Sequence, residues 1–148
     1  MSQLQFQVEL PRTKPTLPSE SCADFFDREH DVLVLDVENQ VIKFAWDIAT
    51  PGAGRREIRI YAPSAWAFYF QQPMPKISEE DVYRLILPNR DLRSTELKRI
   101  LACSSDHIHN LKPLFVTTRE PRQEDGPNSF SVFSRASLVD FLRSRRLS

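Results

Sequence analysis

A group of short polar side chains near residue 107 has the types and spacing that suit hydrogen bonding to nucleic-acid bases. Ile108 and Leu111 stand three residues apart, so both face inward on a helix over residues 105–111. The residues expected to face outward are Ser105, Asp106, His107, His109, Asn110 and Lys112, with Ser104 at the start of the helix. Exposed donors and acceptors on a helix read base edges in a DNA major groove, and asparagine has the bidentate geometry that suits adenine. The pattern therefore predicts contact with double-stranded DNA.

Arginines in two predicted hairpin tips and at the C-terminus are candidate phosphate contacts. They are Arg55, Arg56 and Arg59 at the first tip, Arg119 and Arg122 in a tip over residues 117–128, and Arg143, Arg145 and Arg146 at the end of the chain. Acidic residues in the second tip, Glu120, Glu124 and Asp125, offset much of its attraction for DNA. Two interpretations of each tip stay open, a phosphate contact and a solvated loop.

The patterns that indicate catalysis or metal binding are missing from the sequence. It has no phosphate-cradling glycine-rich loop and no GxSxG, HExxH or CxxC motif. Carboxylates at residues 79–81 and 124–125 are explained by helix capping and solvation. The two cysteines, Cys22 and Cys103, lie far apart in the chain and are expected to be free thiols. We therefore expect no enzyme, no metal site and no cofactor.

The elements that would position the polar group follow one another in the last third of the chain. The first is a helix whose apolar stripe is Leu97, Ile100 and Leu101. Ser94 or Thr95 is expected to cap this helix, Ser104 to cap the next one, and Pro113 to end it. Two strand-like runs and a last helix over residues 134–142 complete the unit.

This order of helix, turn, helix, hairpin and helix resembles the winged helix-turn-helix of the excisionase and MerR-type DNA-binding families. The residues that carry the resemblance are Ala102, Ser104, Ile108 and Leu111, followed by the segment from Ser134 to Leu142. In these families a small residue marks the turn and a spaced hydrophobic pair anchors the recognition helix. Pro113 stands where the family usually turns at a glycine. The resemblance implies a recognition helix over residues 105–111 and a wing that reaches phosphates or the minor groove.

The same order of elements appears a second time in residues 19–70. A short helix from Ser19 would place Cys22, Phe25 and Phe26 inward, and a second helix would carry Val32 and Leu35, with Val41 as a further candidate. Strands over residues 44–48 and 57–61 would flank the first tip. The segment IRIYAPSAWAFYF (58–70) aligns without a gap on FSVFSRASLVDFL (130–142). The sequence therefore predicts a degenerate internal repeat.

The second helix of the first copy differs in a way that bears on function. Its carboxylates, Asp31, Asp36 and Glu38, would repel phosphates, so we do not expect it to read DNA. Leu33 and Val34 add apolar surface outside the Val32/Leu35 stripe. We expect the N-terminal arm or another subunit to cover this surface.

An N-terminal arm and a connector account for the remaining residues. Leu4, Phe6, Val8 and Leu10 alternate with polar residues, as in a half-buried strand, and the prolines over residues 11–18 argue against regular structure. The strand would pair within its own chain or in a homodimer, and both alternatives stay open. Ser78 and Asp81 form a capping box for a connecting helix with Val82, Leu85 and Ile86 on its apolar face. The expected segments are 1–18, 19–72, 73–93 and 94–148.

Composition and charge bound the class of protein. With 148 residues and 41% hydrophobic side chains the chain has enough apolar surface for a core. Its formal net charge is zero, but from residue 90 onward eleven basic residues face seven acidic ones, which gives +4 there and leaves −4 before it. No run is long and apolar enough to cross a bilayer, and the N-terminus lacks a signal-peptide layout. We expect a cytoplasmic protein without a membrane partner, nucleoid-associated if it binds DNA.

These observations predict an α+β fold of tandem winged helix-turn-helix units with small β-hairpin wings. The predicted function is that of a non-enzymatic DNA-binding protein, either a transcription regulator or a recombination accessory factor. The alternative is an interaction or structural adaptor of phage or mobile-element type that keeps the fold without binding DNA. The neutral net charge and the acidic first unit support the alternative.

Overall fold

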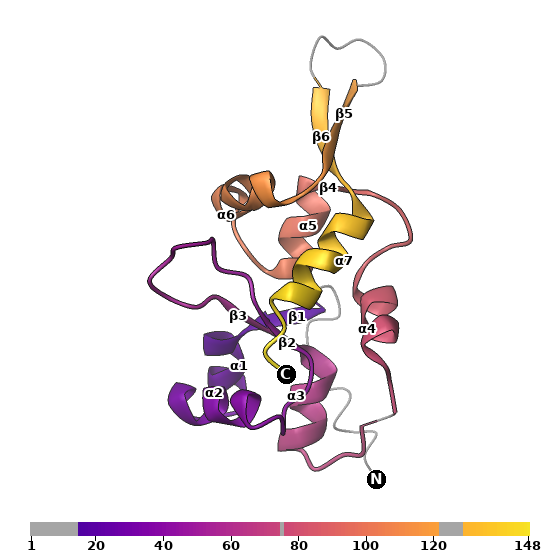
Figure 1. The fold of residues 1–148 in the computed structure, drawn as a ribbon. Helices are drawn as coiled ribbons and strands as arrows, with labels where there is room; N and C mark the ends of the chain where they lie inside the picture. The colour runs from indigo at the N-terminus through magenta and orange to yellow at the C-terminus, as the bar shows by residue number, and fades with distance from the viewer. Residues whose placement is uncertain (1–14, 75, 122–128) are drawn as a thin grey trace.

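The computed structural model describes residues 15–74, 76–121 and 129–148 as an α+β chain (Figure 1). These residues form seven α-helices and two small antiparallel sheets of three strands each. In Figure 1 the first half of the chain lies below the second half, and α4 (Glu79–Ile86) stands to one side. The predicted α+β class is confirmed. The strand expected within residues 4–10, and Arg122 with the acidic pair that follows it, fall outside the described residues.

The two halves of the chain have the same order of elements. The first half consists of β1 (Thr16–Pro18), α1 (Ser19–Phe25), α2 (His30–Glu38), β2 (Ala45–Asp47), β3 (Ile58–Tyr61) and α3 (Ala62–Tyr69). The second half consists of β4 (Leu92–Arg93), α5 (Ser94–Leu101), α6 (Ser105–Leu111), the 3₁₀ helix η2 (Lys112–Leu114), β5 (Thr117–Pro121), β6 (Ser129–Phe133) and α7 (Arg135–Ser144). In each half a strand, two helices, a hairpin and a helix follow one another.

The two sheets also share one topology. The last strand of each half lies in the middle, antiparallel to both neighbours, in the orders β1-β3-β2 and β4-β6-β5. Ile60 pairs with Leu17 on one side and with Ala45 on the other. The expectation that residues 11–18 are irregular throughout was wrong, because 16–18 form β1. This strand lies at a sheet edge, where a terminal proline removes no ladder hydrogen bond.

The end of the chain extends the first sheet. Trp46 of β2 forms an antiparallel bridge with Arg146. The Leu147 N–H donates to the Ala45 carbonyl at 2.7 Å, and the Phe44 N–H donates to the Ser148 carbonyl at 3.0 Å. The C-terminal residues therefore cover the edge of β2, which would otherwise present unpaired backbone groups.

The helices α5 and α6 follow the predicted pattern closely. The residues predicted to face inward are all 2% exposed or less: Leu97, Ile100, Leu101, Ile108 and Leu111. Ser104 Oγ accepts a hydrogen bond from the His107 N–H at 3.1 Å, so the predicted cap of α6 is confirmed. The predicted cap of α5 was wrong. Arg93 is its N-cap, and Glu96 accepts a hydrogen bond from the Arg93 N–H at 3.1 Å, because the helix begins directly after β4.

In α2 the buried stripe differs from the predicted one. Leu33 and Val37 are fully buried, whereas Val32 is 47% and Leu35 54% exposed. Apolar residues lie on several sides of this helix, so periodicity alone does not fix its phase. Packing against Cys22 and Ile42 selects the stripe at Leu33 and Val37, four residues apart.

Three more residues predicted to be inward are exposed. Phe25, the last residue of α1, is 41% exposed, while Phe26 directly after it is buried. Val41, 46% exposed, lies beyond the end of α2. Leu85 of α4 is 64% exposed, and Tyr83 is buried on that helix together with Val82 and Ile86. In each case a neighbouring residue reaches the core instead.

The predicted alignment of the repeat is shifted by one residue along both the strand and the helix. Helix α3 begins directly after Tyr61, whereas Ser134 separates β6 from α7 and caps it. The pair Leu17 and Ile60 in the first sheet has its counterpart in the pair Leu92 and Phe133. Ile60 therefore corresponds to Phe133 and not to Val132.

The core connects the two halves. One hydrophobic cluster lies within the first half, around Cys22, Leu33 and Trp66. The larger cluster combines Leu97, Leu111 and their neighbours with Trp46 and Ile48 from β2 and the loop that follows it. Because one cluster contains residues of both halves, they pack as a single body. Among the described helices, none has the length and apolar character that crossing a membrane requires.

Leu111→Ala tests the orientation of α6. Leu111 is fully buried, so we expect the variant to lose about 2–5 kcal/mol of unfolding free energy in chemical denaturation. The matched control is Leu114→Ala, because Leu114 is 41% exposed in the adjoining η2. Equal losses in the two variants would contradict the assignment of the buried and exposed faces.

Glu96→Gln tests the cap of α5 through its pH dependence. The hydrogen bond from Arg90, followed by the Arg93 N–H, lowers the pKa of Glu96 from its ordinary 4.5 to about 2. A lowered pKa stabilises the fold above pH 4.5, and the contribution disappears as the pH falls from 4.5 towards 2. Because solvent screens this surface pair, we expect only about 0.5–1 kcal/mol.

The measurement is the free energy of unfolding across that pH range. The difference between the wild type and Glu96→Gln should shrink as the pH falls. The difference between the wild type and Arg90→Gln should shrink in the same way. If the unfolding free energy of Arg90→Gln equals that of the wild type at every pH, Arg90 is not the cause of the lowered pKa of Glu96.

Candidate nucleic-acid interface

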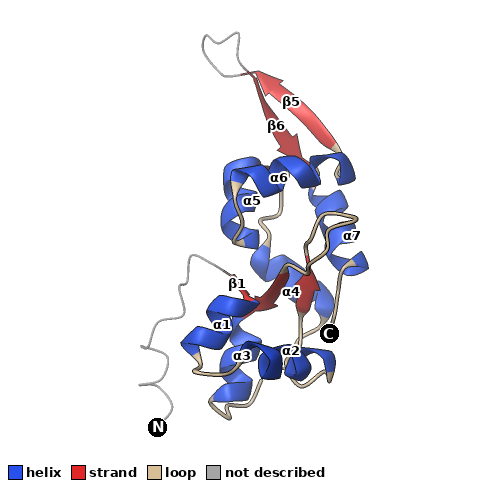
Figure 2. Cartoon of the chain, turned by 90° about the vertical axis from the view of Figure 1, so that its left-hand side faces the viewer, coloured by secondary structure: helices blue, strands red, loops and turns tan. Residues whose placement is uncertain are grey.

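The exposed face of α6 carries the polar residues that the sequence singled out. Ser105, Asp106, His109 and Asn110 are exposed, and Lys112 is half-buried. The opposite face, with Ile108 and Leu111, is buried. In the part of the chain that the structure describes, Asn110 has no hydrogen-bond partner, so its amide is not used as a helix cap. Figure 2 shows α6 on the surface below the hairpin of β5 and β6.

His107 does not lie on this face as predicted. It is half-buried, and its Nε2 lies 2.7 Å from the carbonyl oxygen of Ile48 in the first half. A carbonyl oxygen only accepts, so Nε2 carries the proton and donates. The expectation that His107 reads bases was therefore wrong, because its side chain attaches α6 to the loop after β2.

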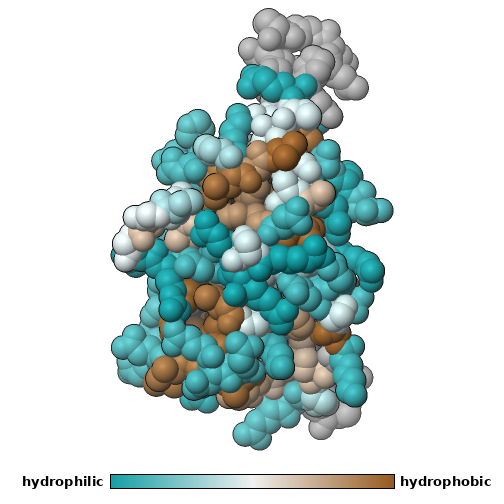
Figure 3. Space-filling view, in the orientation of Figure 1, coloured by the Kyte–Doolittle hydropathy of each residue, from teal (hydrophilic) through white to brown (hydrophobic). Residues whose placement is uncertain are grey.

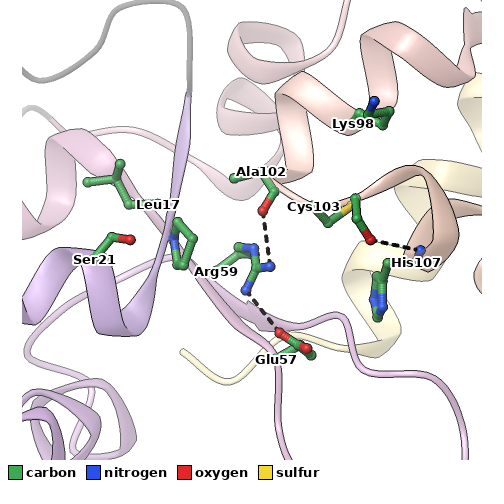
Figure 4. A pocket seen from close by; sticks show the side chains of 10 residues that line it. Leu17, Ser21, Glu57, Arg59, Lys98, Ala102, Cys103 and His107 are labelled. Atoms are coloured by element: carbon green, nitrogen blue, oxygen red, sulfur yellow. Dashed lines mark hydrogen bonds and ion pairs between the residues drawn. The ribbon is translucent and has the colours of Figure 1, made fainter.

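The turn between α5 and α6 is held by an arginine of the first sheet. Arg59 of β3 is 6% exposed, and its guanidinium donates to the carbonyl of Leu101 at 2.7 Å. It also donates to the carbonyl of Ala102 at 3.1 Å (Figure 4). Thr16 Oγ1 of β1 donates to the carbonyl of Ile100 at 2.6 Å. These carbonyls lie at the end of α5, where the helix has no further N–H groups to bond them. Arg59 is therefore a structural residue, and the expected phosphate contact was wrong.

A cleft of about 690 Å³ lies beside this contact, between the first sheet and the turn. Figure 4 shows Lys98, Cys103 and His107 on one wall and Ser21 with Leu17 on the other. Burial raises the pKa of Cys103 to about 11 and that of Cys22 to about 12, so both thiols stay protonated at neutral pH. Neither thiol has the ionised form that nucleophilic chemistry requires.

The first strand of the second hairpin reaches further along the chain than predicted. Residues 117–121, assigned from the sequence to the tip, form β5, and Thr117 and Arg119 pair with Phe133 and Ser131 of β6. Arg119 is exposed on this strand. Five continuous ladder pairs extend the strands, which explains the shorter tip. The other predicted arginine of the tip, Arg122, is outside the described residues.

The arginines of the first tip have different surroundings. Arg56 forms an ion pair with Glu38 at 2.9 Å, so its charge is directed towards α2. Arg55 is exposed, and within the described residues it takes part in no hydrogen bond or ion pair. Of these two predicted phosphate contacts, Arg55 is the one whose charge is available to a ligand.

The three C-terminal arginines bind the protein itself. Arg143 forms an ion pair with Glu80, and Arg146 pairs with Glu79 at 2.9 Å. Arg145 donates to the carbonyl of Ala49 at 2.9 Å. These side chains therefore bind α4 and the loop after β2, and the predicted trailing contact with DNA stays a prediction.

The comparisons with known proteins do not add a family. No family model matches the chain, and neither the curated proteins nor the solved structures include one with significant similarity to it. Residues 15–74, 76–121 and 129–148 also contain no group of three or more His, Cys, Asp or Glu side chains arranged to hold a metal ion.

Sequence reasoning missed the residues that join the two halves, above all Arg59 and Thr16. One signal was present. Arg59 interrupts the apolar strand IRIY between Ile58 and Ile60, so its side chain points to the opposite face of the sheet from theirs. All four residues of this strand are buried, which means that the second face of the sheet is covered as well.

Arg59→Met tests this contact. The methionine keeps the length of the side chain but leaves the carbonyls of Leu101 and Ala102 without their donor. Each buried carbonyl that loses its partner is expected to cost about 1–3 kcal/mol of unfolding free energy. The control is Arg55→Met in the exposed tip, which should stay close to the wild type in chemical denaturation. Equal stability of both variants would mean that Arg59 does not hold the turn.

Proposed function

We propose that this chain is a non-enzymatic DNA-binding protein in which α6 is the recognition helix of a winged helix-turn-helix. A transcription regulator or a recombination accessory factor fits this role. The observation that carries the proposal is the face of α6 with Ser105, His109 and Asn110, which is exposed and polar while the opposite face is buried. A helix presented in this way has the form that a major groove admits.

The helix before it supports the proposal. α5 and α6 meet at Ala102, which has the left-handed backbone angles φ 52° and ψ 52°. The turn is short, and α6 is capped by Ser104 directly after it. Arg59 and Thr16 hold the end of α5 from the other side. The orientation of α6 is therefore fixed before any ligand binds, which limits the entropy cost of binding.

The hairpin of β5 and β6 supplies the second part of the proposed interface. Thr118 and Arg119 are exposed along β5, and the hairpin projects beyond the helices in Figures 1 and 2. Asp106 on the exposed face of α6 opposes phosphates, although a carboxylate also accepts from the amino group of cytosine. We assign sequence reading to Asn110 and its neighbours, and phosphate binding to the hairpin.

An adaptor function is the second candidate, and the first half supports it. Phe25, Val32 and Leu35 are between 41% and 54% exposed on α1 and α2. Figure 3 shows apolar surface gathered in this part of the molecule, and a second patch below the hairpin where Leu114 and Val116 are exposed. Exposed apolar surface of this kind is typical of protein contacts, such as a homodimer.

The experiment compares a double variant on the exposed face of α6 with a control variant elsewhere on the surface. Replacing Asn110 and His109 together by alanine should weaken binding to a duplex selected from a random pool, measured by fluorescence anisotropy. The expected weakening is about 1–3 kcal/mol for each base that the variant no longer reads. The control is Asn89→Ala, because Asn89 lies between α4 and β4, away from the proposed reading face. Unchanged affinity in the double variant would exclude α6 as the reading helix, and failure of the wild type to bind any duplex at low salt would favour the adaptor.

A further inference from the structure

The loop between β2 and β3 has a defined shape at its tip. The Ala53 N–H donates to the carbonyl of Thr50 at 3.1 Å, and Gly52 has a φ of +83°. Proline at the second position and a glycine with positive φ at the third are the pattern of a type II turn. Gly52 requires its residue type here, because a side chain at this φ is strained.

Hydrogen bonds of three side chains hold the base of this loop. Asp47 Oδ1 accepts from the N–H groups of Ala49 and Glu57, both at 3.0 Å, and so closes the two ends of the loop. His107 of α6 donates to the carbonyl of Ile48, and Arg145 after α7 donates to that of Ala49. Two donors from the second half therefore fix a loop of the first half beside α6. In Figure 1 the loop reaches towards α6 on the same side of the molecule.

The charges in and beside this loop differ in whether they are already compensated. Arg59 is buried in the contact with α5, and Arg56 is paired with Glu38. Glu57 lies 3.5 Å from Arg59 Nη1, so its charge is also compensated. Arg55 stands between two exposed neighbours and has no partner within the described residues. The adjoining Gly54 has open space around its Cα atom, which lets a ligand approach the backbone closely.

We infer that the β2–β3 loop is a second phosphate-binding element of the DNA interface, with Arg55 as its contacting cation. The inference rests on the proposed function of α6. It places α6 between two hairpins, its own β5–β6 hairpin on one side and the β2–β3 loop of the first half on the other. The first half thus contributes to DNA binding through its hairpin, although its acidic α2 does not.

His107 is the positioning residue of this arrangement. Its hydrogen bond to Ile48 fixes the distance between the loop and the exposed face of α6. When α6 lies in the major groove of DNA, a phosphate of the adjoining backbone then lies next to Arg55. A contact of this kind adds affinity for every DNA sequence and carries no sequence information.

The test is a salt titration of the full chain on random duplex DNA. Arg55→Ala should reduce the slope of log affinity against log salt concentration by about 0.9, the value for one phosphate contact. The control is Arg84→Ala on α4, which removes another exposed positive charge on the side of the molecule away from α6. Arg84→Ala should leave the slope unchanged. In a His107→Phe background, Arg55→Ala should change the slope less than in the wild type.

The outcomes separate the two proposals. A smaller slope in Arg55→Ala alone supports the inference. If the wild type binds and both arginine variants have the same slope, whether changed or unchanged, the inference about Arg55 is overturned. The proposal that α6 reads DNA then remains. No binding by the wild type overturns the DNA-binding function and this inference together. Arg55 has no partner within the described residues, so thermal melting should show that its removal leaves the fold intact.

Discussion

The geometry of the whole chain depends on the hydrogen bonds that the carbonyl groups at the end of α5 accept. A helix end leaves carbonyl groups without partners, and here they are buried against the first sheet. Arg59 and Thr16 donate to the carbonyls of Ile100, Leu101 and Ala102, and both donors come from the other half. The same contact holds Ala102 in a left-handed conformation, which costs an alanine about 1–2 kcal/mol. The contact between the two halves therefore stabilises the sharp turn into α6.

A second set of contacts makes this attachment rigid. Trp46 Nε1 donates to the hydroxyl of Tyr83 at 3.3 Å, and that hydroxyl donates to Glu79 at 2.5 Å. Glu79 also binds Arg146, so β2, α4 and the C-terminal residues meet in one network. Burial, followed by the hydrogen bond to Glu79, raises the pKa of Tyr83, so the phenol stays a donor at neutral pH. Because residues 146–148 complete the first sheet, the first half alone lacks backbone partners at the edge of β2.

The sequence predicted the second half better than the first, for a physical reason. In α5 and α6 polar residues surround a single apolar stripe, so the period of Leu97, Ile100, Ile108 and Leu111 leaves one orientation. α2 is apolar on several sides, and only its neighbours decide that Leu33 turns inward. The sequence did not predict the contacts between the halves, because Arg59, His107 and Arg145 have the same residue types that bind phosphates. Arginine and histidine donate hydrogen bonds to carbonyl groups at helix ends as readily as to DNA, and the burial of the side chain shows which partner it has.

This internal use of cations bears on the proposed binding of DNA. The arginines that give the second half its excess of positive charge are largely engaged within the protein, at Glu79, Glu80 and Glu96 among others. If α6 reads DNA, few phosphate contacts accompany it, and each contributes a slope of only about 0.9 to the salt dependence. Non-specific affinity is then weak, and base contacts from α6 supply a larger share of the binding energy than in a strongly basic protein. A neutral chain with a small number of placed cations thus favours discrimination between sites over tight binding to all of them, since the attraction that does not depend on sequence is reduced.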